Sequence, residues 1–304
     1  MEGKILSTVG GIYKVYSNGT TYSLFSRGAI KHKSFSLCAG DNIIFDEKEN
    51  VIVEACERKN FLIRPRSANV DLMMITMSVV EPELSPELIY KFLTYANLNG
   101  IPAAVLFTKM DRLVDTSKVD NLKNDLEKLG YRVFLLSPEK TEIIQELQGF
   151  LAEKTTIIMG QTGVGKSSAI NLIDPQFNRK IGEYSEALGR GKHQTKEVIL
   201  LPFKNGFIGD TPGFSSLELD LYKEDLAQYF PGYEKYYLEC YFSNCLHQNE
   251  KECKIKEEIN NGNLSKEGYD VYIKLLNQLD FRSQRYKKWR IILLQVYYQQ
   301  INHI

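Results

Sequence analysis

The sequence predicts a chain of three parts: a small N-terminal β-barrel, a doubly wound α/β domain and a helical C-terminal domain. Short strands separated by turn residues fill about the first 64 residues, and strands alternate with helices from Val70 to about residue 220. The remainder is aromatic and helical, and it carries three of the five cysteines. We place the domains at residues 1–65, 66–220 and 221–304.

The composition indicates a globular protein and excludes disordered and collagen-like chains, because 43% of the 304 residues are hydrophobic and 25% are charged. The 38 basic and 38 acidic residues cancel, so a uniformly basic, nonspecific nucleic-acid surface is not expected. No apolar run reaches 18 residues, and the N-terminus lacks an apolar signal core. We therefore expect a cytoplasmic protein with no membrane partner, acting as a monomer.

The barrel is predicted from short runs of β-branched and aromatic residues. Strands are expected at IYKVYS and TTYSLF, with Asn18-Gly19 as the turn between them, and at NIIF and VIVEA further along. This pattern fits an OB fold, which often binds nucleic acid, or an SH3-like barrel, and does not choose between them. A basic loop between these strands either contacts phosphates or is simply solvated; it contains Arg27, Lys31, His32 and Lys33.

The α/β domain begins with DLMMITMSVV, a continuous apolar run of the kind found in buried parallel strands. Ser85-Pro86 then opens a helix that Gly100 ends, and AAVLF is the next strand. Helices are expected at 116–129 and 141–151, and strands at YRVFLL, TTIIM, EVILLPF and GFIGD. A doubly wound sheet of this kind binds its ligands at the carboxyl ends of the strands.

A phosphate-binding loop is the most specific motif. Residues 160–167, GQTGVGKS, match G-x4-G-K-[ST] in full, between the strand TTIIM and the helical SSAINLI. The glycines let backbone N–H groups surround a phosphate, Lys166 would reach the β- and γ-phosphates, and the Ser167 hydroxyl would bind Mg²⁺. The expected nucleotide contacts in this loop are Gly160, Gln161, Thr162, Gly163, Val164, Gly165, Lys166, Ser167 and Ser168.

The residues TKMD at 108–111 follow the strand AAVLF and fit the [NT]-K-x-D element that reads guanine in GTPases. Asp111 would accept hydrogen bonds from guanine N1–H and N2–H₂, a donor pair that adenine lacks. The stem of Lys109 would lie along the base, and Thr108 begins the motif. Ser137 follows the strand YRVFLL and is the candidate for the guanine-O6 loop, because Pro138 has no N–H to donate. These elements predict GTP and GDP as ligands.

Two further segments suit nucleotide-dependent switches. Asp210-Thr211-Pro212-Gly213 fits D-x-x-G, in which Asp210 would hold Mg²⁺ through water and the Gly213 N–H would sense the γ-phosphate. The basic, glycine-rich segment 189–195 precedes the strand EVILLPF. Its Thr195 is the candidate for the hydroxyl that completes the Mg²⁺ shell.

Hydrolysis also needs a group that orients the attacking water. Many GTPases place a Gln directly after D-x-x-G, but this chain has Phe214, which forms no hydrogen bond. His193 is the candidate in its place, because a neutral imidazole can hold a water molecule. The alternative is that His193 contacts RNA or phosphate. The candidate catalytic residues are His193, Thr195 and Lys166.

The motifs occur in an unusual order. The base-reading elements at 108–111 and 137 precede the phosphate-binding loop, and the switch elements come last. The same three-dimensional site results if the chain is circularly permuted, which is tolerated when the original termini lie close together.

Cys240, Cys245, His247 and Cys253 form the pattern C-x4-C-x-H-x5-C. Three thiolates and one imidazole within 14 residues suit a single tetrahedral Zn²⁺ ion. Four protein ligands leave no position for water, so the zinc is predicted to be structural and not catalytic. The alternative is a set of unconnected cysteines in a reduced core.

With these motifs, the chain resembles the RsgA (YjeQ/YloQ) family of circularly permuted GTPases of small-ribosomal-subunit assembly. The resemblance runs from the barrel to about residue 286 and is most specific at TKMD, GQTGVGKSS, GRGKHQT, DTPGFSSLEL and the cysteine pattern. It implies an N-terminal OB fold, a permuted GTPase domain and a zinc-containing helical domain. It also implies GTP hydrolysis stimulated by the small ribosomal subunit, and contact of the outer domains with ribosomal RNA.

The chain departs from the family pattern in three places. Gln194 stands where the family usually has Thr, and Pro138 replaces a Gly-rich continuation. The third departure is the end of the chain beyond Tyr286, and residues 281–304 carry five basic and no acidic residues. This tail contacts RNA, packs as a helix or has no dedicated role.

Two other functions remain open from the sequence alone. One is a P-loop GTPase with a different client, such as translation or transport. The other is an RNA-binding module whose nucleotide site hardly turns over. A single-turnover GTPase assay with and without small subunits separates them.

Overall fold

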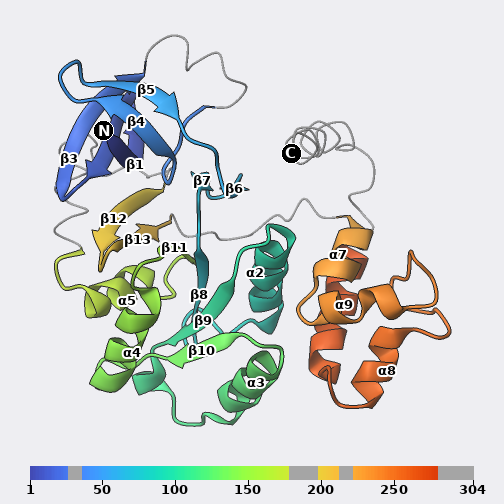
Figure 1. The fold of residues 1–304 in the computed structure, drawn as a ribbon. Coiled ribbons are helices and arrows are strands. Elements are labelled where there is room, and N and C mark those ends of the chain that lie inside the picture. Colours follow the sequence, from blue (N-terminus) through green and yellow to red (C-terminus); the bar gives the residue numbers. More distant parts are fainter. Residues whose placement is uncertain (27–35, 178–197, 212–221, 280–304) are drawn as a thin grey trace. The chain divides into compact units, whose positions relative to one another are not determined.

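The computed structural model describes residues 1–26, 36–177, 198–211 and 222–279 (Figure 1). Its contacts divide the chain into two compact units, Met1–Glu218 and Leu219–Ile304. The first unit contains a barrel and a six-stranded sheet, and the second is helical. The domain limits at 65 and 220 stay predictions. Within the described ranges, no helix is long and apolar enough to cross a membrane.

The N-terminal barrel is closed and has the strand order β1-β2-β3-β5-β4. Strands β3 and β5 pair in parallel, whereas the other neighbours are antiparallel. This arrangement is a five-stranded Greek-key barrel, which favours the OB fold over the SH3-like alternative. The strands are β1 (Glu2–Val9), β2 (Ile12–Ser17), β3 (Thr20–Ser26), β4 (Asn42–Asp46) and β5 (Val51–Ala55).

Strand β1 is an addition to the four strands that the sequence predicts. Its register with β2 shifts between Ile5 and Ser7, which marks a β-bulge. As a result, the consecutive side chains of Ile5 and Leu6 are both fully buried. A strand with two adjacent buried residues lacks the strict alternation by which strands are found in a sequence.

The sheet of the first unit has the order β10-β9-β8-β11-β13-β12. All neighbours are parallel except β12 and β13, which form an antiparallel hairpin. A short ladder of β6 (Phe61–Leu62) and β7 (Ser67–Ala68) precedes the sheet. The six strands are β8 (Leu72–Ser78), β9 (Ala103–Thr108), β10 (Arg132–Leu135), β11 (Thr155–Met159), β12 (Ile199–Phe203) and β13 (Gly206–Asp210).

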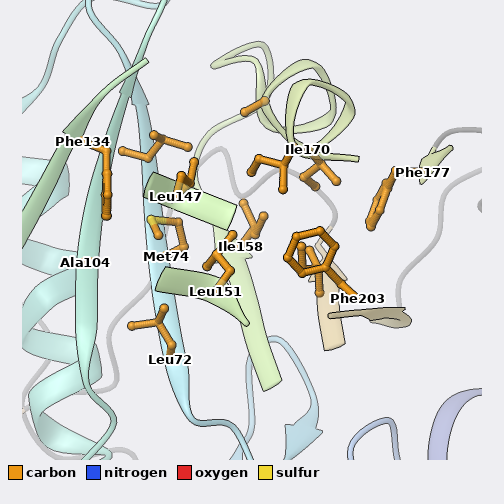
Figure 2. Packing of buried hydrophobic residues seen from close by; sticks show 14 of the residues in the cluster. Leu72, Met74, Ala104, Phe134, Leu147, Leu151, Ile158, Ile170, Phe177 and Phe203 are labelled. Atoms are coloured by element: carbon orange, nitrogen blue, oxygen red, sulfur yellow. The ribbon is translucent and has the colours of Figure 1, made fainter. Parts of the chain in front are cut away.

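Helices cover both faces of this sheet (Figure 1). The predicted cap of the first is confirmed, since the Ser85 side chain accepts a hydrogen bond from the Leu88 N–H. Figure 2 shows Leu147 and Leu151 of one helix, and Ile170 of another, facing Met74 and Ile158 of the sheet. The helices are α2 (Pro86–Leu98), α3 (Ser117–Lys128), α4 (Thr141–Leu151) and α5 (Lys166–Ile173), with a single 3-10 turn, η1 (Met110–Arg112).

The second unit is built on aromatic side chains. The ring centroids of Phe230 and Tyr233 are 4.9 Å apart, and that of Tyr272 lies 5.0 Å from Tyr233. The helical, aromatic character predicted for this part is confirmed in the described residues. Its elements are α7 (Lys223–Tyr229), η2 (Tyr233–Lys235), η3 (Tyr237–Glu239), α8 (Lys254–Asn260) and α9 (Lys266–Leu279).

Candidate functional site

The predicted nucleotide-binding elements meet at one edge of the sheet. The loops that follow β9, β10, β11 and β13 all begin at the carboxyl ends of neighbouring parallel strands. Residues from four separate stretches of sequence are thereby brought together, as a doubly wound fold requires. They are the regions around 108–111, 137, 160–168 and 210–211.

The phosphate-binding loop leaves β11 in close contact with the neighbouring strand β8. A Cβ atom on Gly160 would lie 2.2 Å from the carbonyl oxygen of Thr76, so only glycine fits here. Val164 is fully buried and anchors the middle of the loop. Helix α5 then begins at Lys166, which places the free N–H groups of its first turn at the loop.

Lys166 is buried within the curve of this loop. Its ammonium donates hydrogen bonds to the carbonyl oxygens of Gly160 at 2.9 Å and of Gln161 at 2.8 Å. Burial lowers the pKa of Lys166 from its ordinary value, whereas the negative charge of Asp210 acts in the opposite direction. The hydrogen bonds place the Lys166 ammonium where the phosphates of a nucleotide bind in P-loop proteins.

Asp210 lies at the end of β13, next to the start of α5. Its Oδ2 atom accepts a hydrogen bond of 3.4 Å from the Ser167 hydroxyl, and its Oδ1 atom is buried with no partner among the described residues. Burial raises the pKa of Asp210, while the positive charge of Lys166 lowers it. A hydroxyl beside a buried carboxylate with an unpaired oxygen is a donor set that suits Mg²⁺ and its waters.

The side chains of Thr108 and Lys109 hold the phosphate-binding loop from the end of β9, which β8 separates from β11 in the sheet. The Thr108 hydroxyl donates to the carbonyl oxygen of Val164 at 2.5 Å, and the Lys109 ammonium donates to that of Gly163 at 3.0 Å. Lys109 has a left-handed backbone with φ 62°, which turns the chain into η1. The first two residues of TKMD thus contact the loop through its backbone.

Asp111 and Ser137 occupy the two loops expected to read the base. Asp111 is exposed in η1, and the N–H of the preceding Met110 donates to the carbonyl oxygen of Leu136 at 3.3 Å. Ser137 is buried directly after Leu136, and its carbonyl accepts from the Lys140 N–H at 3.1 Å. The two loops lie side by side because they follow the neighbouring parallel strands β9 and β10. This is the placement that a shared base-binding site needs.

Several predicted site residues lie outside the described residues. These are His193 and Thr195 in the segment before β12, and Gly213 in the segment after β13. Phe214, Gln194 and the basic loop at 27–33 lie outside them as well. The roles assigned to these residues remain predictions.

A second site is formed by the four predicted metal ligands of the second unit. Their ligand atoms all lie within 4.8 Å of one another, and all four residues are buried. The Nδ1 atom of His247 is 3.3 Å from the Cys253 sulfur and 3.7 Å from the Cys240 sulfur. Two ligand atoms of a tetrahedral zinc are about 3.5 Å apart when the bonds are about 2.0 and 2.3 Å. The cluster, Cys240, Cys245, His247 and Cys253, therefore has the spacing of a metal centre.

The protonation of this cysteine–histidine cluster follows from its surroundings. The Nε2 atom of His247 lies 3.1 Å from the Ala227 carbonyl, which can only accept, so Nε2 carries the proton and Nδ1 keeps its lone pair for a metal. Burial lowers the pKa of His247 and raises that of Cys245 to about 12. Three buried thiols can ionise together only beside a cation, so these residues fit a bound metal ion.

Some contacts at both sites had no signal in the sequence. The Lys109 ammonium also donates to the Glu81 carbonyl, and His247 depends on the Ala227 carbonyl. A backbone carbonyl can belong to any residue type, so no motif reveals it. The aromatic residues around His247 were visible as composition only; they are Tyr233, Tyr237 and Tyr272.

Comparison with known proteins gives one consistent result. The family model described as RsgA GTPase matches residues 55–220. The small ribosomal subunit biogenesis GTPase RsgA 2 of Oceanobacillus iheyensis is 36% identical, over 94% of this chain and 99% of the relative. The small ribosomal subunit biogenesis GTPase RsgA of Streptococcus pneumoniae is 37% identical, over 95% and 98%.

Solved structures resemble the chain over nearly its whole length. YloQ, described as a circularly permuted GTPase, has a TM-score of 0.77 at 31% identity and covers 94% of this chain and 96% of its own. YjeQ from Thermotoga maritima also has a TM-score of 0.77, at 30% identity, over 93% of this chain and 99% of its own. The order of motifs along the chain and the order of strands in the sheet agree with such a permutation.

Proposed function

This chain belongs to the RsgA GTPase family, and we propose that it is a GTP-hydrolysing factor for biogenesis of the small ribosomal subunit. The observation that carries the proposal is the convergence of the phosphate-binding loop, Asp210 and the TKMD loop at one sheet edge. The relatives that match over nearly their full length are small ribosomal subunit biogenesis GTPases, which supports the small ribosomal subunit as the partner. The proposal places the protein in the cytoplasm, acting as a monomer with no membrane partner.

We assign the binding of GTP and GDP to the described edge. The N–H groups of residues 160–168 and the Lys166 ammonium bind the phosphates, which replaces the contacts of Lys166 with the loop carbonyls. Asp111 accepts from the guanine N1–H and N2–H₂ groups, and the stem of Lys109 lies along the base. The backbone at Ser137 contributes the O6 contact. This division explains why Asp111 is exposed whereas Lys166 is buried.

Ser167 and Asp210 are the residues that hold Mg²⁺ in this proposal, with Thr195 as a further hydroxyl ligand. The ion, when bound, neutralises charge on the phosphate oxygens. Asp210 would act through water: its buried Oδ1 has no partner among the described residues, and its Oδ2 lies 3.4 Å from the Ser167 hydroxyl.

Hydrolysis requires a water aligned with the γ-phosphate. We assign its orientation to the His193 imidazole, because the residue after D-x-x-G is Phe214. Lys166 stabilises the negative charge that develops on the phosphate oxygens, and the Gly213 N–H senses whether the γ-phosphate is present. Contact with the small subunit and its RNA brings His193 into position, so turnover is slow without it.

We propose that the cysteine–histidine cluster binds one structural Zn²⁺ ion. The support is four buried ligands at tetrahedral spacing, with the His247 tautomer fixed by the Ala227 carbonyl. The metal-ligating group consists of these four described residues, and four protein ligands complete the shell of zinc. The ion therefore contributes stability to the second unit and takes no part in hydrolysis.

The test is single-turnover hydrolysis of GTP with purified small subunits, large subunits or neither. We expect strong stimulation by small subunits and little by large subunits, with ATP neither bound nor hydrolysed. Equal stimulation of GTP hydrolysis by small and large subunits would show that the partner is not specifically the small subunit. Normal GTP binding without turnover under any condition would favour an RNA-binding module instead.

A further inference from the structure

Three large apolar side chains stand exposed beside the cysteine–histidine cluster. Leu238 is 87% exposed, Tyr241 71% and Phe242 44%, and within the described part of the second unit they are the exposed large hydrophobic residues. The rings of Tyr241 and Phe242 meet edge to face, with centroids 4.9 Å apart. We call Leu238, Tyr241 and Phe242 the 238–242 patch. Single exposed apolar residues are common, but a cluster of three suggests a surface that another segment covers.

The backbone holds this patch in place. Cys240, a predicted metal ligand, lies between Leu238 and Tyr241 in sequence. The N–H of Cys245 donates to the Phe242 carbonyl at 3.1 Å, and the hydroxyl of Tyr237 donates to the Ser243 carbonyl at 2.9 Å. The patch is therefore carried by the same hydrogen-bonded loop that carries the cluster.

The sequence around the patch has a small excess of acidic residues. Residues 234–252 contain four Glu and two Lys, and residues 222–279 contain ten acidic against seven basic residues. Glu239 adjoins Leu238 in sequence, and the Glu252 carbonyl accepts from the Tyr241 N–H at 3.5 Å. Both glutamates are exposed. An acidic, apolar surface repels RNA phosphates and favours a partner that is both apolar and basic.

The sequence of this chain contains a segment with those properties. Residues 281–304, which lie outside the described residues, carry five basic and no acidic residues. They also include Trp289 and the apolar run IILL at 291–294. The described chain ends at Leu279, and the 25 residues beyond it span up to about 80 Å when extended. Length therefore does not prevent the segment from reaching a surface of its own unit.

We propose that residues 281–304 bind the 238–242 patch within the same molecule. Trp289 and its apolar neighbours cover Leu238, Tyr241 and Phe242, and the basic side chains lie near Glu239 and Glu252. The apolar contacts provide the affinity, and the charges select this segment over acidic competitors. The covered surface belongs to the second unit and the nucleotide site to the first, and the inference does not depend on the proposed function.

Tryptophan fluorescence of the full chain tests this directly, because Trp289 is the single tryptophan. We expect blue-shifted emission that acrylamide quenches weakly. In the double variant Leu238→Asp/Tyr241→Ser, the emission should shift to the red and quenching should increase several-fold. The matched control is Val114→Ser, which removes a fully exposed apolar side chain from the first unit and should change neither quantity.

A second variant keeps the test valid if the double variant fails to fold. Glu239→Lys changes an exposed side chain only, and it should raise acrylamide quenching of Trp289 while metal content stays constant. Solvent-exposed emission of Trp289 in the unaltered protein would overturn the proposal. Emission that is the same in both variants as in the unaltered protein would also overturn it. A blue shift that occurs only when ribosomal RNA fragments are added would overturn it too, because residues 281–304 would then bind RNA.

Discussion

The nucleotide edge of the sheet and the cysteine–histidine cluster arrange buried polar groups in different ways. At the sheet edge, Lys166 and Thr108 donate to backbone carbonyls of the phosphate-binding loop, and one Asp210 oxygen has no partner among the described residues. In the cluster, three thiols and one imidazole face one another within 4.8 Å. The first arrangement leaves room for an exchangeable ligand, whereas the second closes around an ion that stays.

From this difference we expect loss of the nucleotide and loss of the metal ion to have different effects on the stability of the protein. The strands that form the sheet edge carry the apolar core of the sheet, so we expect the first unit to fold without a nucleotide. The second unit has a smaller core, and the ligands of the cluster lie at both ends of its loop from Cys240 to Cys253. Removing the metal ion should therefore unfold the second unit, whereas removing the nucleotide should leave the first unit folded.

The largest effect is expected for Cys245→Ala. Structural zinc contributes on the order of 10 kcal/mol of apparent binding free energy in small domains, so the variant should release metal and lose the folded second unit. GTP binding by the first unit should persist. Metal analysis, hydrogen exchange over α7 to α9, and a GTP titration measure the three outcomes.

The matched control is Cys56→Ala, which removes an exposed thiol of the barrel. It should keep both metal and stability. If Cys245→Ala instead abolished GTP binding while Cys56→Ala did not, the two sites would not be energetically separate, and the comparison would fail.

His193→Ala should have the next largest effect, on turnover alone. A positioned acid–base group contributes roughly 10²–10⁴-fold, so subunit-stimulated hydrolysis should fall by about that factor while GTP affinity stays constant. Gln194→Ala, one residue further along, is the control and should remain stimulated. Full stimulated turnover in a His193→Ala protein that binds GTP and subunits normally would show that His193 is not the catalytic group.

Asp111→Asn should change base selection by a few kcal/mol, which is roughly a hundredfold in affinity or more. The amide loses the acceptor pair for guanine and gains a donor for the oxygen at position 2 of xanthine. A direct titration should therefore show weaker GTP binding and stronger binding of xanthosine triphosphate. Asp125→Asn on α3 removes the same charge away from the site and should leave both affinities unchanged. Unchanged GTP affinity in Asp111→Asn would reject the assignment.

These two sites also differ in how much of them the sequence predicts. The strands and helices of the sheet follow from apolar runs and caps, and α4 (Thr141–Leu151) and β11 (Thr155–Met159) begin and end where expected. The spacing of the four metal ligands identifies the cluster, because local sequence brings them together. Motifs at strand ends identify the nucleotide edge, because parallel strands end on the same side.

The remaining features of the fold and of the two sites depend on contacts that cannot be predicted from residue types. Strand β1 escapes prediction because a bulge buries Ile5 and Leu6 in succession. The Ala227 carbonyl beside His247 is a backbone atom, and its role appears only when α7 is placed. Thr108 is part of a recognised motif, but its hydrogen bond to the Val164 carbonyl joins loops 56 residues apart. Such long-range contacts follow from tertiary packing.

The smallest effect is expected for Thr108→Val, which tests that long-range contact. Valine has nearly the same shape as threonine but cannot donate, so the buried Val164 carbonyl loses a hydrogen bond worth about 1–3 kcal/mol. The phosphate-binding loop would then be less well held, and GTP affinity should fall about tenfold or less. Thr108→Ser keeps the hydroxyl and should restore the affinity. If valine at this position binds GTP as tightly as serine does, the contact is only incidental to the loop, and the sheet edge depends on Lys109 and the glycines alone.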